Sequence, residues 1–174
     1  QRTVMPDGSR QLAFNDSDPA SVPDLEKLLA PLGLAGDLLP PSELGPCAYP
    51  YAGVAFLRQR ATEGDLYLAF DAGPFGRAHQ HEDKLGFWLF AYGRSFLVDP
   101  GRHLYDRSAA SYRAHLASTR AHSTILVDGH GQNSAARRDT WIAQQPVDLG
   151  WREAPGEVRA WGAYDLGYGP DAIP

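Results

Sequence analysis

Two histidines separated by one residue are the first candidates for chemistry in this sequence. The stretch AHQHEDKLGFW contains His79, His81 and, two residues further on, Asp83. In an extended chain, residues two positions apart point to the same side, so both imidazoles could leave one face of a strand. Such a pair can bind a metal ion, carry out acid–base chemistry or simply lie exposed at a surface.

Two further side chains lie at the ends of predicted strands and favour metal binding. Asp99 ends the apolar run SFLVD, where a buried charge needs a partner because burying it alone is costly. His122 opens the run HSTILVD. Two histidines and one aspartate from neighbouring strands make a divalent-metal site with water as the fourth ligand; zinc fits best, with iron or manganese as alternatives. Asp83 is either a turn carboxylate or an acceptor that orients a histidine ring.

Arginines and tyrosines gather between these candidates. Arginine forks match the geometry of carboxylates and sulfates, and aromatic faces stack on sugar rings. The segment therefore predicts either a groove for a polyanion or an ordinary solvated loop. The side chains concerned are Arg94, Arg102, Arg107, Arg113, Arg120, Tyr105 and Tyr112. The remaining histidines, His103, His115 and His130, are expected at the surface.

Composition and charge exclude several classes of protein. The chain has 174 residues, 43% of them hydrophobic and 21% charged, which suits one ordinary globular domain. The net charge of −5 argues against a nucleic-acid binder. The single cysteine, Cys47, cannot form an internal disulfide. No apolar run is long enough to span a bilayer, so no membrane span is predicted.

The pattern of the chain changes near residue 50, which predicts two parts. Residues 1–50 contain a short predicted helix in SVPDLEKLLAPLGLAG, ended by Gly33 or Gly36, and a proline-rich connector. Residues 51–174 contain apolar runs with strand alternation, separated by turn signals such as Glu63-Gly64 and Gly93-Arg94. The predicted fold is mainly β, an antiparallel β-sandwich preceded by a short helical segment.

Two long segments together resemble the heparinase II/III-like polysaccharide lyases, which include related alginate and oligoalginate lyases. They are FDAGPFGRAHQHEDKLGFWLFAYGRSFLVDPGRHLY, residues 70–105, and SYRAHLASTRAHSTILVDGHGQN, residues 111–133. They contain the family's Gly-Pro-x-Gly turn, HxHxD, Val-Asp-Pro-Gly, an Arg-rich helix-like segment and a His-x-Thr strand ending in Asp-Gly-x-x-Gln. The family usually has Asn after the strand-opening histidine, where this chain has Ser123.

The resemblance implies cleavage of uronic-acid polysaccharides by β-elimination, in which a base removes the C5 proton and the C4–O glycosidic bond breaks. It makes His79 a catalytic histidine of the cleft. It matches His81, Asp99 and His122 to the ligands of one zinc ion that mainly braces the cleft. From the resemblance alone, Tyr105 is expected to be catalytic and Arg120 is expected to bind substrate. The expected partner is an anionic polysaccharide or oligosaccharide, and a bacterial source would favour a periplasmic or secreted protein.

The family pairs its β-sandwich with a large helical toroid, and residues 1–50 match only the tail of that toroid. We therefore expect the chain to be a fragment. It should be inactive alone, because the family's tyrosine acid/base normally comes from the toroid. It should also self-associate as a homo-oligomer through exposed apolar surface, such as Leu25, Leu28 and Leu29.

Two other interpretations stay open. His79 and His81 also fit the opening of a cupin motif, which would make the chain a metal-dependent oxygenase or isomerase. However, Leu85 and Gly86 stand where that motif has a glutamate. The chain could instead be a non-catalytic carbohydrate-binding β-sandwich in which a metal is purely structural.

Overall fold

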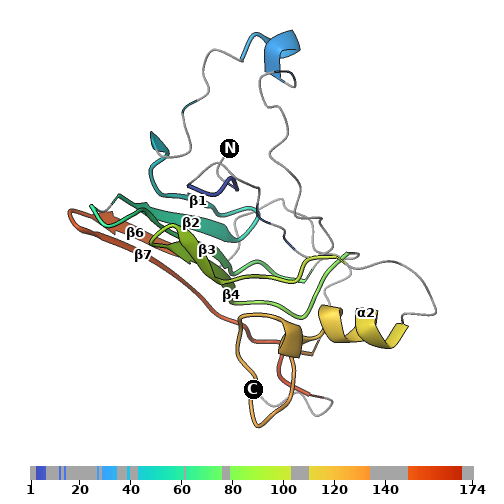
Figure 1. The fold of residues 1–174 in the computed structure, drawn as a ribbon. Helices are drawn as coiled ribbons and strands as arrows, with labels where there is room; N and C mark the ends of the chain where they lie inside the picture. Colours follow the sequence, from blue (N-terminus) through green and yellow to red (C-terminus); the bar gives the residue numbers. More distant parts are fainter. Residues whose placement is uncertain are drawn as a thin grey trace.

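In the part of the chain that the structure describes, short antiparallel strands dominate and the helices are short (Figure 1). The computed structural model describes residues 3–6, 12, 14, 27, 29–34, 39, 43–60, 62–75, 79–102, 110–133 and 149–169. In chain order, its elements are the 3-10 helix η1 (Ala30–Leu32), β1 (Cys47–Tyr49), β2 (Val54–Gln59), β3 (Leu66–Asp71), β4 (Gly86–Ala91), β5 (Arg94–Leu97), α2 (Ala110–Ala117), the 3-10 helix η5 (Thr119–Ala121), β6 (Leu149–Ala154) and β7 (Glu157–Gly162).

The first five strands form one antiparallel sheet in the order β1-β2-β3-β4-β5. Successive residues of a strand point to opposite faces, so the register sorts side chains onto two faces. One face carries Phe56, Ala69 and Trp88, which are aligned across β2, β3 and β4. These positions are buried.

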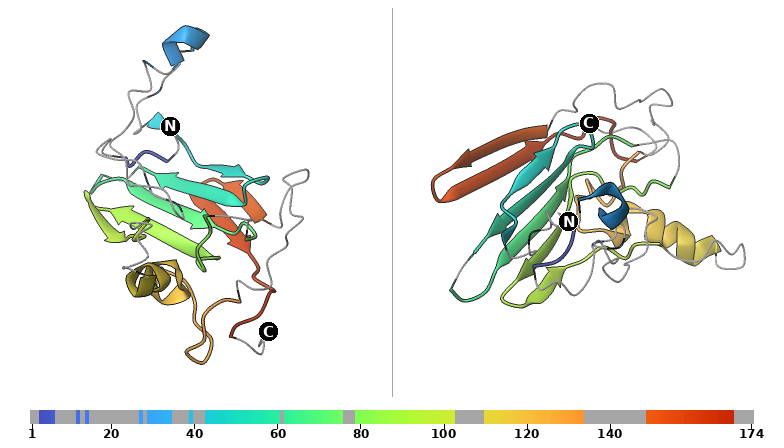
Figure 2. Two further views of the ribbon diagram at one scale, coloured as in Figure 1. Left: turned by 90° about the vertical axis from the view of Figure 1, so that its right-hand side faces the viewer. Right: turned by 90° about the horizontal axis from the view of Figure 1, so that it is seen from above.

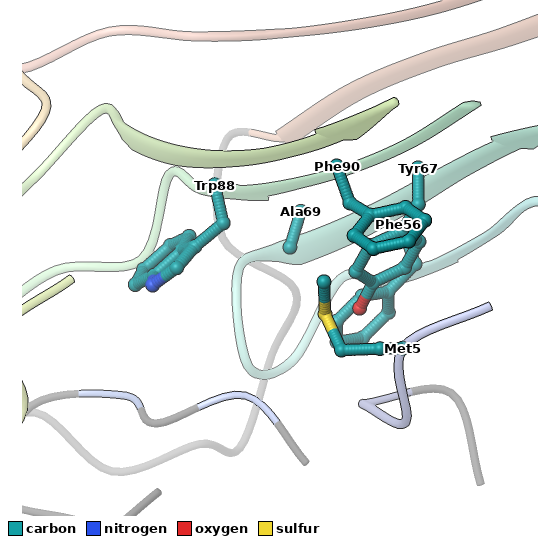
Figure 3. Packing of buried hydrophobic residues seen from close by; sticks show 6 residues of the cluster. All are labelled: Met5, Phe56, Tyr67, Ala69, Trp88 and Phe90. Atoms are coloured by element: carbon teal, nitrogen blue, oxygen red, sulfur yellow. The ribbon is translucent and has the colours of Figure 1, made fainter. Parts of the chain in front are cut away.

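The buried core lies on this face, under residues from the start of the chain. Phe14 packs its ring 4.5 Å from the ring of Trp88, and the guanidinium of Arg58 lies 4.2 Å above the ring of Tyr67. The N-terminal residues are thus part of the sheet's own core. Figure 3 shows the six residues of the central cluster, Met5, Phe56, Tyr67, Ala69, Trp88 and Phe90.

The opposite face carries leucines and is covered by the hairpin of β6 and β7, a second, two-stranded sheet. Leu57, Leu68 and Leu89 are aligned across β2, β3 and β4 on this side. Figure 2 shows the hairpin on the side of the sheet away from the N-terminal residues. A cavity of ≈ 710 Å³ lies between the leucines and the hairpin turn at Pro155 and Gly156. The predicted mainly-β, antiparallel architecture is therefore confirmed.

The hairpin of β4 and β5 turns at Tyr92 and Gly93, next to the predicted position. Both residues have positive φ, 50° and 73°, as a type I′ turn requires. β5 lies at the edge of the sheet, and a register shift interrupts its pairing between Leu89 and Phe90 of β4. Phe96 on β5 is 53% exposed.

One predicted strand differs from the structure. The run from His122 to Asp128 is not a strand; its described residues make only an isolated bridge between Val127 and His130. Instead, the main chain of this run contacts the start of β4, where the amide of Phe87 donates to the carbonyl of Ser123 at 3.2 Å.

The predicted helix near residue 30 is described only in part. η1 is a single turn, and Gly33, with a φ of 71°, ends it by donating its amide hydrogen to the carbonyl of Ala30 at 3.0 Å. Leu29 is half-buried, whereas Leu25 and Leu28 lie outside the described residues. None of the helices in the described ranges is long and apolar enough to cross a membrane.

Candidate functional site

The HxHxD stretch lies in the connection between β3 and β4 and not on a strand. Asp71 at the end of β3 is paired with Gly86 at the start of β4, so the chain leaves and re-enters the sheet at one end. His79 is exposed and has a φ of 59°, whereas His81 is only 4% exposed. The prediction that the two histidines open a strand is wrong, because a left-handed residue at position 79 ends the two-residue alternation.

Three side chains from two distant segments meet in a buried cluster. His81, Asp83 and His122 each offer one potential ligand atom, and these atoms lie within 4.8 Å of one another. The ring centroids of the two histidines are 5.1 Å apart. The amide of Glu82 donates to the carbonyl of Ala117 at 2.9 Å, which ties the connection to the end of α2 and places His122 beside it.

Asp99 lies next to this cluster and holds one of its rings. Its Oδ2 is 2.5 Å from Nδ1 of His122, and the side chains of Asp99 and His122 are 4% and 1% exposed. A carboxylate can only accept, so Nδ1 donates the hydrogen and Nε2 of the neutral ring keeps its lone pair. Oδ1 of Asp99 accepts from the amide of Gly101 at 2.9 Å.

This contact affects the protonation of His122. Burial alone lowers the pKa of the imidazole, but the hydrogen bond and charge of Asp99, with the charge of Asp83, outweigh it and raise the pKa. The prediction that Asp99 is itself a metal ligand stays a prediction. In this structure Asp99 contacts the ring of His122, and Asp83 completes the group of ligand atoms.

The donor atoms of the cluster suit a metal ion. Among the described residues, no hydrogen bond reaches either carboxylate oxygen of Asp83 or Nε2 of His122, although all three atoms are buried. Oδ1 of Asp83 has only the ammonium of Lys84 nearby, at 3.4 Å. Leaving such a group unsatisfied costs about 1–3 kcal/mol, and a cation bound to one ligand atom from each residue would offset part of this cost. Burial also raises the pKa of Asp83, while the charge of Lys84 acts against this rise. Imidazole and carboxylate donors are those that zinc and related divalent ions prefer.

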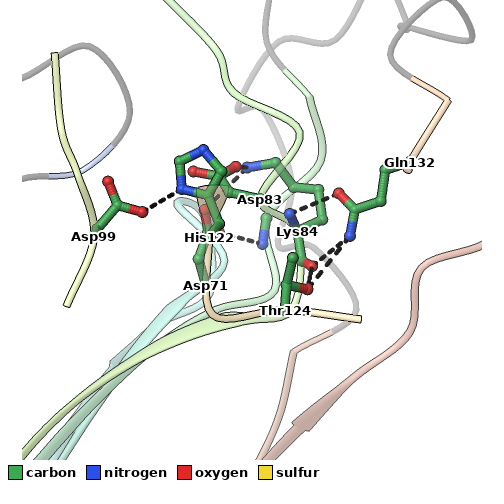
Figure 4. A network of polar contacts seen from close by, with 8 residues as sticks. Asp71, Asp83, Lys84, Asp99, His122, Thr124 and Gln132 are labelled. Atoms are coloured by element: carbon green, nitrogen blue, oxygen red, sulfur yellow. Dashed lines mark hydrogen bonds and ion pairs between the residues drawn. The ribbon is translucent and has the colours of Figure 1, made fainter. Parts of the chain in front are cut away.

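A buried polar network around Lys84 lies next to the cluster of His81, Asp83 and His122 (Figure 4). Nζ of Lys84 lies 2.9 Å from Oδ2 of Asp71 and 3.4 Å from Oδ1 of Asp83. Gln132 and Thr124 bind the main chain of Lys84. Sequence reasoning missed Asp71, Lys84, Thr124 and Gln132. A signal existed for Asp71, because strand alternation places it on the same face as the buried Ala69.

The other predicted site residues lie outside this network or outside the described residues. Arg120 is exposed, and its Nη2 donates to the carbonyl of Gly129 at 2.6 Å. Its role in substrate binding stays a prediction. Tyr105 and His103 lie outside the described residues. His115 and His130 are exposed, as expected.

The sequence was compared with models of known protein families. Residues 44–172, well over half of the chain, match the family described as Heparinase II/III-like, C-terminal. The chain belongs to this family. The match covers the strands of both sheets and the cluster of His81, Asp83 and His122.

Solved structures agree with this heparinase II/III-like fold. A heparinase III gene product has a TM-score of 0.60 and 19% identity, over 74% of this chain and 22% of that one. The heparan sulfate lyase HepC from Pedobacter heparinus has a TM-score of 0.59 and 22% identity, over 74% of this chain and 22% of that one. The chain thus spans less than a quarter of the length of these two structures. A comparison with curated protein sequences finds no match.

Proposed function

We propose that this chain belongs to a lyase that cleaves uronic-acid polysaccharides by β-elimination and that it carries the metal site and one histidine of the cleft. The observation that carries the proposal is the family match over residues 44–172, within which the buried His81, Asp83 and His122 cluster lies two residues from the exposed His79. The named lyases among the similar structures support an anionic polysaccharide as the substrate class.

The reaction moves two protons and two electron pairs at the sugar. A base takes the proton from C5, the C5 electrons form the C4–C5 double bond, and the C4–O bond breaks as the leaving oxygen gains a proton. The C5 proton becomes acidic enough only if the uronate carboxylate is neutralised. His79 is the candidate for this neutralisation or for proton abstraction, because its side chain is accessible while the other two histidines are buried. Tyr105 is proposed as a second catalytic group and Arg120 as a substrate-binding cation.

His81 and His122 would hold a divalent metal, with a carboxylate from Asp83 or Asp99 as the third ligand. We propose zinc as the metal, since it accepts imidazole and carboxylate ligands together. Bound zinc would supply a fixed positive charge and a brace between the β3–β4 connection and the segment after η5.

The test is formation of an unsaturated uronate. The natural gene product that carries these residues is incubated with heparan sulfate and with alginate, and ultraviolet absorbance reports the new double bond. We expect product from at least one polymer, and we expect His79→Ala to lower turnover at least about 100-fold. Binding of the polymers without any product would contradict the lyase proposal and favour the carbohydrate-binding alternative.

The cupin alternative makes a different prediction for the same sample. It requires a redox-active metal and an additional glutamate ligand near Leu85 and Gly86. The family match and the sheet order both argue against it. Purification of the protein with bound iron and with oxygenase activity would contradict our proposal.

A further inference from the structure

Lys84 is a buried cation that the proposed lyase chemistry does not use. The residue is 4% exposed, and its Nζ lies between Oδ2 of Asp71 at 2.9 Å and Oδ1 of Asp83 at 3.4 Å. The ring of Phe75 lies 5.5 Å away and shields this position. Lysine is rarely buried unless it is paired, because removing its charge from water is expensive. Its charge therefore acts on the two carboxylates with little screening by solvent.

Hydrogen bonds from the side chains of Gln132 and Thr124 fix the main chain of Lys84. Gln132 accepts a hydrogen bond from the amide of Lys84 at 2.8 Å and donates one to its carbonyl at 2.6 Å. Oγ1 of Thr124 donates to the same carbonyl at 2.6 Å. With its backbone held on both sides, Lys84 keeps its ammonium directed at the two aspartates.

Asp71 is fixed as firmly as Lys84. Its Oδ1 accepts from the amide of Gly73 at 2.8 Å, and its Oδ2 accepts from the ammonium of Lys84. Asp83 differs, because it has the longer ion pair with Lys84, at 3.4 Å, and no hydrogen bond from the described residues reaches its oxygens. Lys84 is thus shared between one carboxylate that is otherwise satisfied and one that is a potential metal ligand.

We infer that Lys84 and Asp71 act as a pair that sets the charge of the metal site. The ammonium of Lys84 lies 3.4 Å from Oδ1 of Asp83, where it repels the incoming cation. Asp71 offsets part of that repulsion. The carboxylates of Asp71, Asp83 and Asp99, together with the ammonium of Lys84, give the region a net charge of about −2 when all four groups are ionised. The inference rests on the metal site proposed above.

The two members of the pair predict opposite effects on metal affinity. Lys84→Met removes the repelling charge, so the affinity for Zn²⁺ should rise about tenfold. Asp71→Asn leaves the repulsion of Lys84 without its offset, so the affinity should fall about tenfold. A purely structural role would weaken binding in both variants, because both would distort the cluster.

The experiment uses purified protein at pH 8, stripped of metal, with Zn²⁺ titrated against a chromogenic chelator of known affinity. Lys84→Arg is the matched control, which keeps the charge and should change the affinity less than about threefold. Circular dichroism establishes that each variant is folded. If Lys84→Met does not fold, the contrast between Asp71→Asn and Lys84→Arg carries the test, and equal affinities in these two variants overturn the inference.

The outcomes separate this inference from the proposals it rests on. Zinc binding by the unchanged protein, with affinity lowered in both Lys84→Met and Asp71→Asn, overturns the charge-setting role and leaves the metal site standing. No zinc binding by the unchanged protein overturns both. The unsaturated-product assay reports the lyase proposal independently of either result.

Discussion

His79 and His81 are two residues apart and lie in opposite surroundings. His79 is exposed with a left-handed backbone, whereas His81 is buried against His122 and Asp83. The pair therefore offers one accessible imidazole and one that is reserved for the cluster. This division suits a site in which one side chain meets substrate while its neighbour contributes to the structure.

Metal content should distinguish the two histidines. We expect His81→Ala to lose bound zinc and to unfold at lower temperature, because a bound metal stabilises the folded state by mass action. His79→Ala should keep its zinc, measured by elemental analysis in buffer free of chelator. Loss of zinc from His79→Ala would show that this residue is a ligand and that its assigned role is wrong.

The contact between Asp99 and His122 should make stability depend on pH. The folded protein raises the pKa of His122 above its ordinary value of 6.5, so the stabilisation is complete below pH 6.5 and is lost as pH rises through the folded pKa. Asp99→Asn removes the charge and should lower the free energy of unfolding of the metal-free protein by about 2 kcal/mol at pH 6. Urea denaturation at pH 6 and pH 8.5 measures the difference, which should be smaller at the higher pH. A difference that stays constant or grows would mean that the ring is neutral in the contact.

At the scale of elements, turns and strands follow local sequence rules closely. β2, β3 and β4 each have six residues and contain the apolar runs VAFL, LYLAF and GFWLFA. The turn between β4 and β5 contains the glycine that a type I′ turn needs. The run after His122 has a similar apolar pattern but does not form a strand. Its polar groups bind Lys84 and Phe87, which lie in the distant β3–β4 connection and in β4. Sequence periodicity cannot register such contacts, because they depend on which segments meet in space.

Gly93 allows the cost of this turn to be measured. A Cβ at Gly93 would meet no atom within 4 Å, so Gly93→Ala adds strain only through its φ of 73°. We expect a loss of about 1 kcal/mol in the free energy of unfolding. Gly45→Ala is the control, because Gly45 also has open space and does not have a positive φ. It should change stability by less than about 0.5 kcal/mol. Equal effects in the two variants would contradict a conformational origin.

At the scale of the whole molecule, the family and the mainly-β fold could be predicted, while the buried network could not. The motifs from Phe70 to Gln132 indicate the family, and alternation indicates the sheet. Lys84 resembles any surface lysine in sequence, and its burial follows only from the approach of Gln132 and Asp71. The part of the chain that contains Tyr105 lies outside the described residues, so its assigned role stays a prediction.

The edge of the sheet gives a prediction about association. Phe96 and Val98, at and just after β5, are 53% and 56% exposed. We expect the 174-residue chain to self-associate as its concentration rises, because exposed apolar surface favours contact. Sedimentation velocity should show this, and Phe96→Lys should shift the chain towards the monomer. Leu34→Lys is the control, since Leu34 is 47% exposed and lies outside the sheet. A monomer at every concentration would contradict the expectation.

The shortness of β5 limits what such association can become. Fibrils grow when a long, flat strand offers an unbroken row of amide and carbonyl groups to the next molecule. β5 has four residues, begins with Arg94, and pairs with β4 across a register shift that adds local twist. Complexes formed through this edge should therefore remain small and should dissociate on dilution, without seeding or a lag phase.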